Sequence, residues 1–225
     1  MIHHIPRWLR ENRGFLIFLV LLGLFRTAVA DWNPIPSGSM RPTIQEGDVV
    51  FVNRLAYQVK LPLTDVVLAR TGEVERGDIV TFASPQDGTR LIKRVIGLPG
   101  DVISMRDKVL WINGRRIDYI ITGTALEPLA GRQVPATRLQ EKLDEHAHGV
   151  QWLDGLATVP DFGPVVVPPD EYLMLGDNRD DSGDSRYFGF VPRHLIVGRA
   201  ERVLVSVDLL GQWAPQFQRF GMKLE

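Results

Sequence analysis

The sequence contains no cysteine and only five histidines among its 225 residues. The absence of cysteine excludes disulfide bonds, thiolate zinc sites and cysteine nucleophiles. The histidines are His3, His4, His146, His148 and His194. In a strand, His146 and His148 would place two imidazoles on one face, but no third ligand accompanies them, so we expect a solvated loop here and not a metal site.

The chain also lacks an excess of charge of either sign. It carries 26 basic and 27 acidic residues, which gives a formal net charge of −1. A nucleic-acid-binding domain is expected to carry a basic patch, and the composition offers none, so nucleic acid is not an expected partner. Apolar residue types make up 44% of the chain. This content is enough to bury the core of one or two compact units.

Long apolar segments are absent except for one near the N-terminus. Phe15–Phe25 contains eleven apolar residues without interruption, and the basic residues Arg7, Arg10 and Arg13 precede it. A basic start, a short apolar run and an ending such as Ala28-Val29-Ala30 are typical of a cleavable signal peptide.

A permanent membrane anchor is the alternative interpretation of the same segment. As a helix, the nineteen residues Gly14–Trp32 extend for about 28 Å, enough to cross the hydrocarbon core. Arg26 then lies near the outer interface, where its long side chain reaches water, and Trp32 lies in the interfacial aromatic belt. The basic flank keeps residues 1–13 in the cytoplasm and places everything after residue 32 outside.

Beyond this segment the pattern is mainly that of β-structure. Three Gly-Asp steps each precede an apolar, β-branched run, and each predicts a turn followed by a strand. These steps are Gly47-Asp48, Gly77-Asp78 and Gly100-Asp101. Asn113-Gly114, between Val109–Ile112 and Arg115–Ile117, predicts a type I′ hairpin.

The later part of the chain has a less regular pattern. We expect residues 123–164 to be rich in loops, with a helical turn over Thr137–Glu145. Strands are expected again at Val165–Val167, Tyr172–Leu175, Leu195–Val197 and Arg202–Val205. The predicted fold is mainly β: one transmembrane helix (14–32), then an antiparallel catalytic domain (33–103 and 169–225) interrupted by a smaller β-rich insertion (104–168).

Ser39, in Pro36-Ser37-Gly38-Ser39-Met40, is a candidate nucleophile close to the membrane surface. Serine also occurs in turns for backbone reasons alone. No histidine forms a convincing triad with it, and Lys93 is the better base. A lysine with a pKa of about 10.4 must become neutral near pH 7, which burial among apolar neighbours favours. The alternative is that Lys93 is an edge-strand charge that prevents aggregation.

Four segments, Pro36–Thr43, Arg76–Phe82, Leu91–Asp101 and Gly176–Arg186, resemble in the same order the signature segments of bacterial type I signal peptidases. The resemblance implies a membrane-anchored serine endopeptidase with a β fold related to that of the SOS repressors. It favours the anchor over the cleaved signal peptide. It also implies cutting after Ala-x-Ala, at the outer face of the cytoplasmic membrane.

The resemblance further implies a role for individual residues. Ser39 is the nucleophile and Lys93 the general base, Ser37 adds an oxyanion donor, and Ser182 orients Lys93. Structural support is implied for Arg94, Asp177, Asp184 and Arg186. The positions implied to line small apolar substrate pockets are Ile35, Met40, Ile44, Val50, Val52 and Ile92. Ordinary core packing also explains these six positions.

We expect no cofactor. Asn178, Asp180 and Ser182 partly follow an EF-hand spacing, but Gly189 replaces its terminal glutamate. The expected partners are the signal peptides of exported preproteins and membrane lipid, and the chain is expected to be a monomer. Two other functions remain open: a self-cleaving Ser/Lys regulatory protease, which needs a DNA-binding domain where residues 1–32 have an apolar segment, and an inactive membrane-anchored β scaffold.

Overall fold

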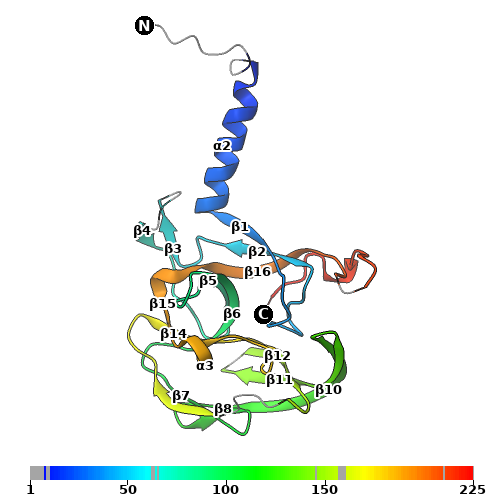
Figure 1. Ribbon diagram of the computed structural model, residues 1–225. Coiled ribbons are helices and arrows are strands. Elements are labelled where there is room, and N and C mark those ends of the chain that lie inside the picture. Colours follow the sequence, from blue (N-terminus) through cyan, green and yellow to red (C-terminus); the bar gives the residue numbers. More distant parts are fainter. Residues whose placement is uncertain are drawn as a thin grey trace.

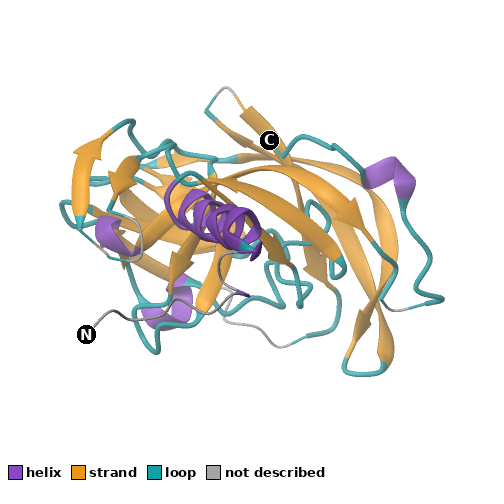
Figure 2. Cartoon of the chain, turned by 90° about the horizontal axis from the view of Figure 1, so that it is seen from above, coloured by secondary structure: helices purple, strands orange, loops and turns teal. Residues whose placement is uncertain are grey.

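A computed structural model describes residues 8, 11–61, 64, 66–144, 146–156, 161–209 and 211–224. Helix α2 (Arg13–Ala28) extends away from a body built almost entirely of strands (Figure 1). Viewed from above this helix, the rest of the regular structure is nearly all strand (Figure 2). Within the residues that the structure describes, no helix has both the length and the apolar character needed to cross a bilayer.

The expectation of a continuous helix over 14–32 is wrong. The helix ends at Ala28, and β1 (Ala30–Pro34) pairs antiparallel with β2 (Asp48–Asn53). Strand pairing supplies the hydrogen bonds that the backbone of β1 would otherwise make in a helix. Asp31 adds a local reason, because its buried carboxylate accepts from Arg26 Nε and Arg90 Nη1, each at 2.9 Å.

The largest sheet has seven strands in the order β1-β2-β16-β5-β6-β14-β15, and every pair in it is antiparallel. Its other strands are β5 (Ile79–Ala83), β6 (Arg90–Gly97), β14 (Glu171–Leu175), β15 (Val191–Pro192) and β16 (Ile196–Ser206). The two strands predicted at 195–197 and 202–205 are therefore one strand. Its register shifts twice against β2, which allows one long strand to follow the curvature of the sheet.

Three smaller sheets complete the β-structure. One contains β13 (Phe162–Val166), β7 (Val102–Arg106), β8 (Val109–Ile112) and β9 (Arg115–Arg116), in that order. A second contains β10 (Asp118–Leu129), β11 (Arg132–Leu143) and β12 (His146–Leu153). A third pairs β3 (Gln58–Lys60) with β4 (Val67–Arg70). The short helices are α3 (Ser185–Phe188), η1 (Arg193–Leu195) and η2 (Phe217–Arg219).

The expectation of a loop-rich region with a helical turn is also wrong. Residues 137–143 belong to β11, and Glu145 lies outside the described residues. Ala130 and Gly131 both have positive φ and form the turn between two twelve-residue strands. These strands are polar on much of their surface, so their composition did not indicate a sheet. Pairing over eleven registered positions stabilises them instead.

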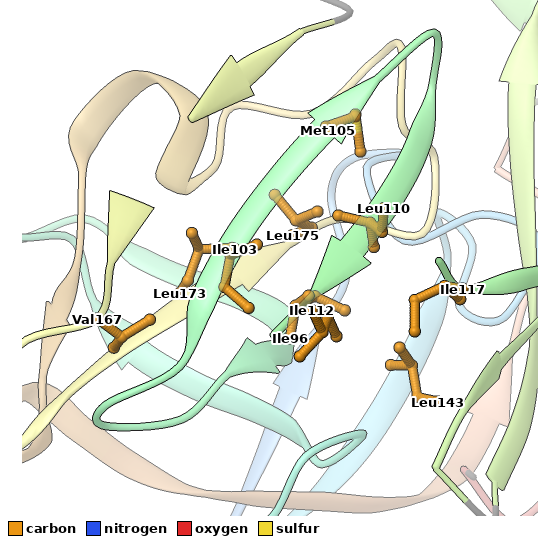
Figure 3. Close-up of a cluster of buried hydrophobic side chains, with 10 residues drawn as sticks. All are labelled: Ile96, Ile103, Met105, Leu110, Ile112, Ile117, Leu143, Val167, Leu173 and Leu175. Carbon is orange, nitrogen blue, oxygen red and sulfur yellow. The ribbon is translucent and has the colours of Figure 1, made fainter. Parts of the chain in front are cut away.

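The core joins the inserted residues to the large sheet. Ile96 of β6 and Leu175 of β14 pack in one cluster with Ile103 of β7, Leu110 of β8 and Leu143 of β11 (Figure 3). Burial of side chains from several sheets in one cluster means that the sheets stabilise one another. The division into two domains stays a prediction.

The predicted Gly-Asp turns and the Asn-Gly hairpin are confirmed. Each of the three glycines has a φ of 89° to 94°. In each turn an Asp carboxylate oxygen accepts the backbone N–H three residues before it, at 2.7 to 3.0 Å. The acceptors are Asp48, Asp78 and Asp101. Asn113 and Gly114 have the positive φ angles of a type I′ turn, and β8 and β9 pair across them.

Gly47→Ala and Gly77→Ala form a matched pair of substitutions. Both positions require a left-handed φ, which costs alanine roughly 1–2 kcal/mol. A Cβ at Gly77 meets nothing within 4 Å, whereas at Gly47 it falls 1.9 Å from the Val207 carbonyl oxygen. We therefore expect Gly47→Ala to lower the free energy of unfolding by about 1–3 kcal/mol more than Gly77→Ala does. Urea unfolding measures the difference, and equal losses would contradict the packing of residues 47 and 207.

Candidate active site

Ser39 lies in a turn between β1 and β2, where its side chain is almost fully buried. The backbone on both sides of Ser39 is held by one residue of a distant loop. Asn178 Nδ2 donates to the Gly38 carbonyl and Asn178 N to the Ser39 carbonyl, each at 3.1 Å. The position of the serine therefore depends on residues about 140 positions away in the sequence.

Lys93 extends from β6 to the Ser39 hydroxyl. Its Nζ donates to Ser39 Oγ at 2.6 Å, and only 3% of Lys93 is exposed. Strand β6 lies between β5 and β14 in the large sheet. The alternative of an exposed edge-strand charge is therefore wrong, because this lysine is neither at an edge nor in solvent.

Burial lowers the pKa of Lys93 to about 8. The carboxylates of Asp184, Asp177 and Asp181 act in the opposite direction, because negative charge favours the ammonium form. Desolvation outweighs them. A hydroxyl within hydrogen-bond distance of an amine that is partly neutral near physiological pH is an arrangement suited to nucleophilic catalysis.

The segment 176–186 contacts Ser39 through Asn178, and two of its ion pairs involve Asp177 and Asp184, whose charges act on Lys93. Asp177 accepts from Arg94 Nε at 2.9 Å and from Nη2 at 2.8 Å, which joins the segment to the strand that carries Lys93. Asp184 pairs with Arg186 at 2.8 Å and also accepts the Gly176 N–H at 3.1 Å. The first pair links two elements, whereas the second is local to the segment.

Ser182 does not make the hydrogen bond to Lys93 that the resemblance implied. Its Oγ is buried and has no hydrogen-bond partner among the residues that the structure describes. The hydroxyl instead faces Gly176, where an added Cβ would lie 2.2 Å from it and 2.4 Å from the Ser39 carbonyl oxygen. Ser37, the other expected hydroxyl, is exposed at the surface beside Gly38.

The six positions expected to line substrate pockets all lie in one apolar cluster. Ile35, Met40, Ile44, Val50 and Val52 are buried there, and Ile92 is partly buried against them. The arrangement agrees with the core-packing interpretation. Of the six, only Ile92 is partly exposed, so only Ile92 could contact a bound substrate directly.

Sequence reasoning missed a buried polar cluster behind the site. His148 belongs to β12 and is buried, so the expected solvated loop is wrong for this residue, although His146 is exposed. Its Nε2 lies 3.2 Å from Glu141 Oε1, and Glu141 also pairs with Arg179. Glu141 and His148 are directly opposite in the register of β11 and β12. Only that register identifies them as neighbours.

Comparison with known proteins gives consistent matches over most of the chain. Residues 8–205 match the family described as signal peptidase, peptidase S26. The chain is 35% identical to signal peptidase I of Pseudomonas fluorescens and 34% identical to that of Pseudomonas aeruginosa. Each match covers 96% of this chain and 80% of the relative.

A similar solved structure is that of a signal peptidase I from Enterococcus faecalis V583. It is 30% identical, with a TM-score of 0.35, and the match covers 57% of this chain and 97% of that chain.

Lys93→Met tests the energetic consequence of burying this amine. The folded pKa is about 8 and the unfolded value ~10.4, so the unfolded chain binds more protons between them and stability rises with pH over that interval. Below the folded pKa the burial costs about 3 kcal/mol. We expect Lys93→Met to melt at a higher temperature than the unsubstituted protein at about pH 6.5 and to lose this advantage above about pH 10. Thermal melts that show no difference at the lower pH would contradict a desolvated lysine.

Proposed function

The chain belongs to the signal peptidase family, peptidase S26, and we propose that it removes the signal peptides of exported preproteins by means of a Ser39–Lys93 dyad. Membership of this family makes it a serine endopeptidase. The observation that carries the dyad is the 2.6 Å hydrogen bond between a buried Lys93 Nζ and Ser39 Oγ.

The chemistry follows from these two groups. Neutral Lys93 accepts the proton of Ser39 as Oγ attacks the carbonyl carbon of the peptide bond to be cut. The resulting oxyanion is stabilised by the Ser39 N–H and the Ser37 hydroxyl. Lys93 then protonates the leaving amine, and the acyl-enzyme forms. In the second half, Lys93 takes a proton from water as its oxygen attacks the ester, and then returns that proton to Ser39 Oγ as the ester bond breaks.

Cleavage after small residues is part of the same proposal. Five branched or bulky side chains are buried in the cluster that contains Met40, the residue after Ser39, and Ile92 packs against this cluster with part of its surface exposed. A substrate pocket whose base is filled by these side chains favours alanine, because larger substrate side chains would overlap with them. This supports a preference for Ala-x-Ala.

Attachment to the cytoplasmic membrane is also proposed, with the active site on the outer face. The apolar side chains of α2 support it, because none of the helix is buried by protein. Its exposed members are Phe15, Ile17, Phe18, Leu19, Val20, Leu21, Leu22 and Phe25. Trp213, Phe217 and Phe220 are exposed on the C-terminal segment, which lies beside β16 in the body (Figure 1). Such side chains are favoured at the interfacial region of a bilayer.

Ser39→Ala and Lys93→Ala are each expected to reduce cleavage of a preprotein by several orders of magnitude, because nucleophile and base act as a unit. The assay incubates purified protein with a preprotein and sequences the new N-terminus. A Lys93→Ala variant with unchanged turnover would exclude the dyad. Lack of cleavage by the unsubstituted protein would favour the inactive scaffold, and cleavage only within its own chain would favour the self-cleaving regulator.

The same assay supplies a pH profile. The base must be neutral, and the neutral fraction of Lys93 increases as pH rises through its pKa of about 8. We expect kcat/KM to rise with pH up to that value and then to level off. A His194→Ala variant is the control, because a limb that moves with this substitution would indicate histidine chemistry.

Membrane attachment is tested by removing α2. Membranes that contain the full chain are washed with alkaline carbonate, and a variant lacking residues 1–28 is treated in parallel. We expect the full chain to remain in the pellet because eight exposed apolar side chains of α2 need apolar surroundings. Release of the full chain by the wash would contradict the anchor and leave the protease proposal unaffected.

A further inference from the structure

Glu141 occupies a buried position that the proposed chemistry does not use. It lies on β11, in the three-stranded sheet of the inserted region, and has no exposed surface. Arg179 donates to it from both terminal nitrogens, at 2.7 Å from Nη1, and the Tyr119 hydroxyl also donates to it. His148 Nε2 lies 3.2 Å from its Oε1. The carboxylate thus has partners from three separate elements.

These partners keep the Glu141 carboxyl group ionised. Burial by itself raises the pKa of a carboxyl group, but the Arg179 guanidinium and the His148 contact outweigh burial, so the pKa of Glu141 lies well below its usual range. The residue is therefore ionised at any pH at which the protein works. A buried carboxylate of this kind is stable only while its cation stays in place.

Arg179 transmits this constraint to the segment 176–186, which contacts the turn that carries Ser39. Its Nε donates to the Gly176 carbonyl at 3.2 Å while its other nitrogens bind Glu141. Its backbone N–H donates to the Gln151 carbonyl at 3.0 Å, and Gln151 N donates to the Asp177 carbonyl at 2.9 Å. Residues 177–179 therefore lie against β12 and form an isolated parallel β-bridge between Gln151 and Asn178.

Asn178, the residue that forms this bridge, also binds the turn that carries the nucleophile. Its Nδ2 donates to the Gly38 carbonyl at 3.1 Å. Gly38 C=O and Ser39 N–H belong to one planar trans peptide, in which the two groups point in opposite directions. Fixing the carbonyl on the Asn178 side therefore directs the Ser39 N–H to the other side, toward the position proposed for the oxyanion. The orientation of that donor depends on the placement of Asn178.

We propose that Glu141 is a positioning residue for the reaction: through Arg179 and Asn178 it aligns the Ser39 backbone N–H with the developing oxyanion. This rests on the proposed protease function and gives the inserted sheet a part in catalysis. Gly176 leaves little freedom for an alternative path of the segment, because even one added carbon would overlap Ser39 and Ser182. A small displacement of residues 176–178 is therefore expected to change the orientation of the Ser39 backbone N–H.

The test separates alignment from stability by comparing Glu141→Gln with combined variants and a control. Glu141→Gln leaves a buried Arg179 charge without its counterion and is expected to lower both the Tm and kcat. The double variant E141Q/R179M contains neither charge, so its Tm should return close to that of the unsubstituted protein. We expect its kcat on a preprotein to stay about 10- to 100-fold low with KM within about twofold, because the donor is misaligned while the binding surface is intact.

A triple variant adds Asn178→Ala to the double variant. If Glu141 acts through Asn178, this addition lowers kcat much less than Asn178→Ala does in the unsubstituted protein, since the alignment is already lost. Val134→Ala, in the small cluster of Val134, Ala136 and Leu153, destabilises the same sheet away from Glu141 and is the matched control. We expect it to lower the Tm but not kcat.

Three outcomes would overturn the positioning role: a normal kcat in the double variant, a loss of kcat in Val134→Ala equal to that in Glu141→Gln, or full additivity with Asn178→Ala. All variants are assayed at a temperature well below their melting points, together with the unsubstituted protein and Ser39→Ala. If the unsubstituted protein does not cleave the preprotein, the proposed function fails. If it does and Ser39→Ala does not, the comparison reports on Glu141 alone.

Discussion

The exclusion of water from Lys93 is the constraint on which the site depends. Three carboxylates and one guanidinium group act on the charge of this lysine. A carboxylate that came closer to Lys93 would favour its charged form and raise its pKa. Asp177 is occupied by Arg94, and Asp184 by Arg186 and the Gly176 N–H. Ion pairs that look like simple structural supports therefore also keep the lysine from acquiring a close counterion. The pKa of about 8 is the result of this balance.

The inserted region is coupled to the site by several independent contacts. Besides Glu141, Asp180 accepts the Leu153 N–H of β12 at 2.9 Å and pairs with Lys108 at 2.8 Å. The shared apolar cluster below these contacts contains Leu143 and residues of β6 and β14. The segment 176–186 makes hydrogen bonds within itself, such as those of Arg186 to Asp184 and to the Arg179 carbonyl, and the neighbouring sheets add further contacts. This explains how a buried loop with many charged residues is kept in one arrangement.

The N-terminal junction shows how a local pattern competes with tertiary contacts. Arg26 pairs with Asp31 and lies 4.6 Å from the centre of the Trp32 ring, and Asp31 is also bound by Arg90. These contacts, together with pairing to β2, hold residues 30–34 as a strand although the apolar run before them favours helix. Ala30 is consequently buried in a sheet, so the Ala-Val-Ala sequence is not presented as an extended free chain.

Local chemistry in the sequence determined the turns, most of the strands of the large sheet and the motif residues. Positive φ at the Gly-Asp and Asn-Gly steps depends on the residue type alone. The strand pattern depends only on apolar residues that recur at every second position. Ser39 and Lys93 are candidates from their local sequence, the resemblance assigns their roles, and the structure brings them within hydrogen-bond distance. Only the tertiary structure decided the path of β10 to β12, the burial of His148, and the partnership of Glu141 with Arg179. Those features arise from strand register and from ion pairs between residues 38 positions apart, and a contact of that kind leaves no periodic signal in the chain.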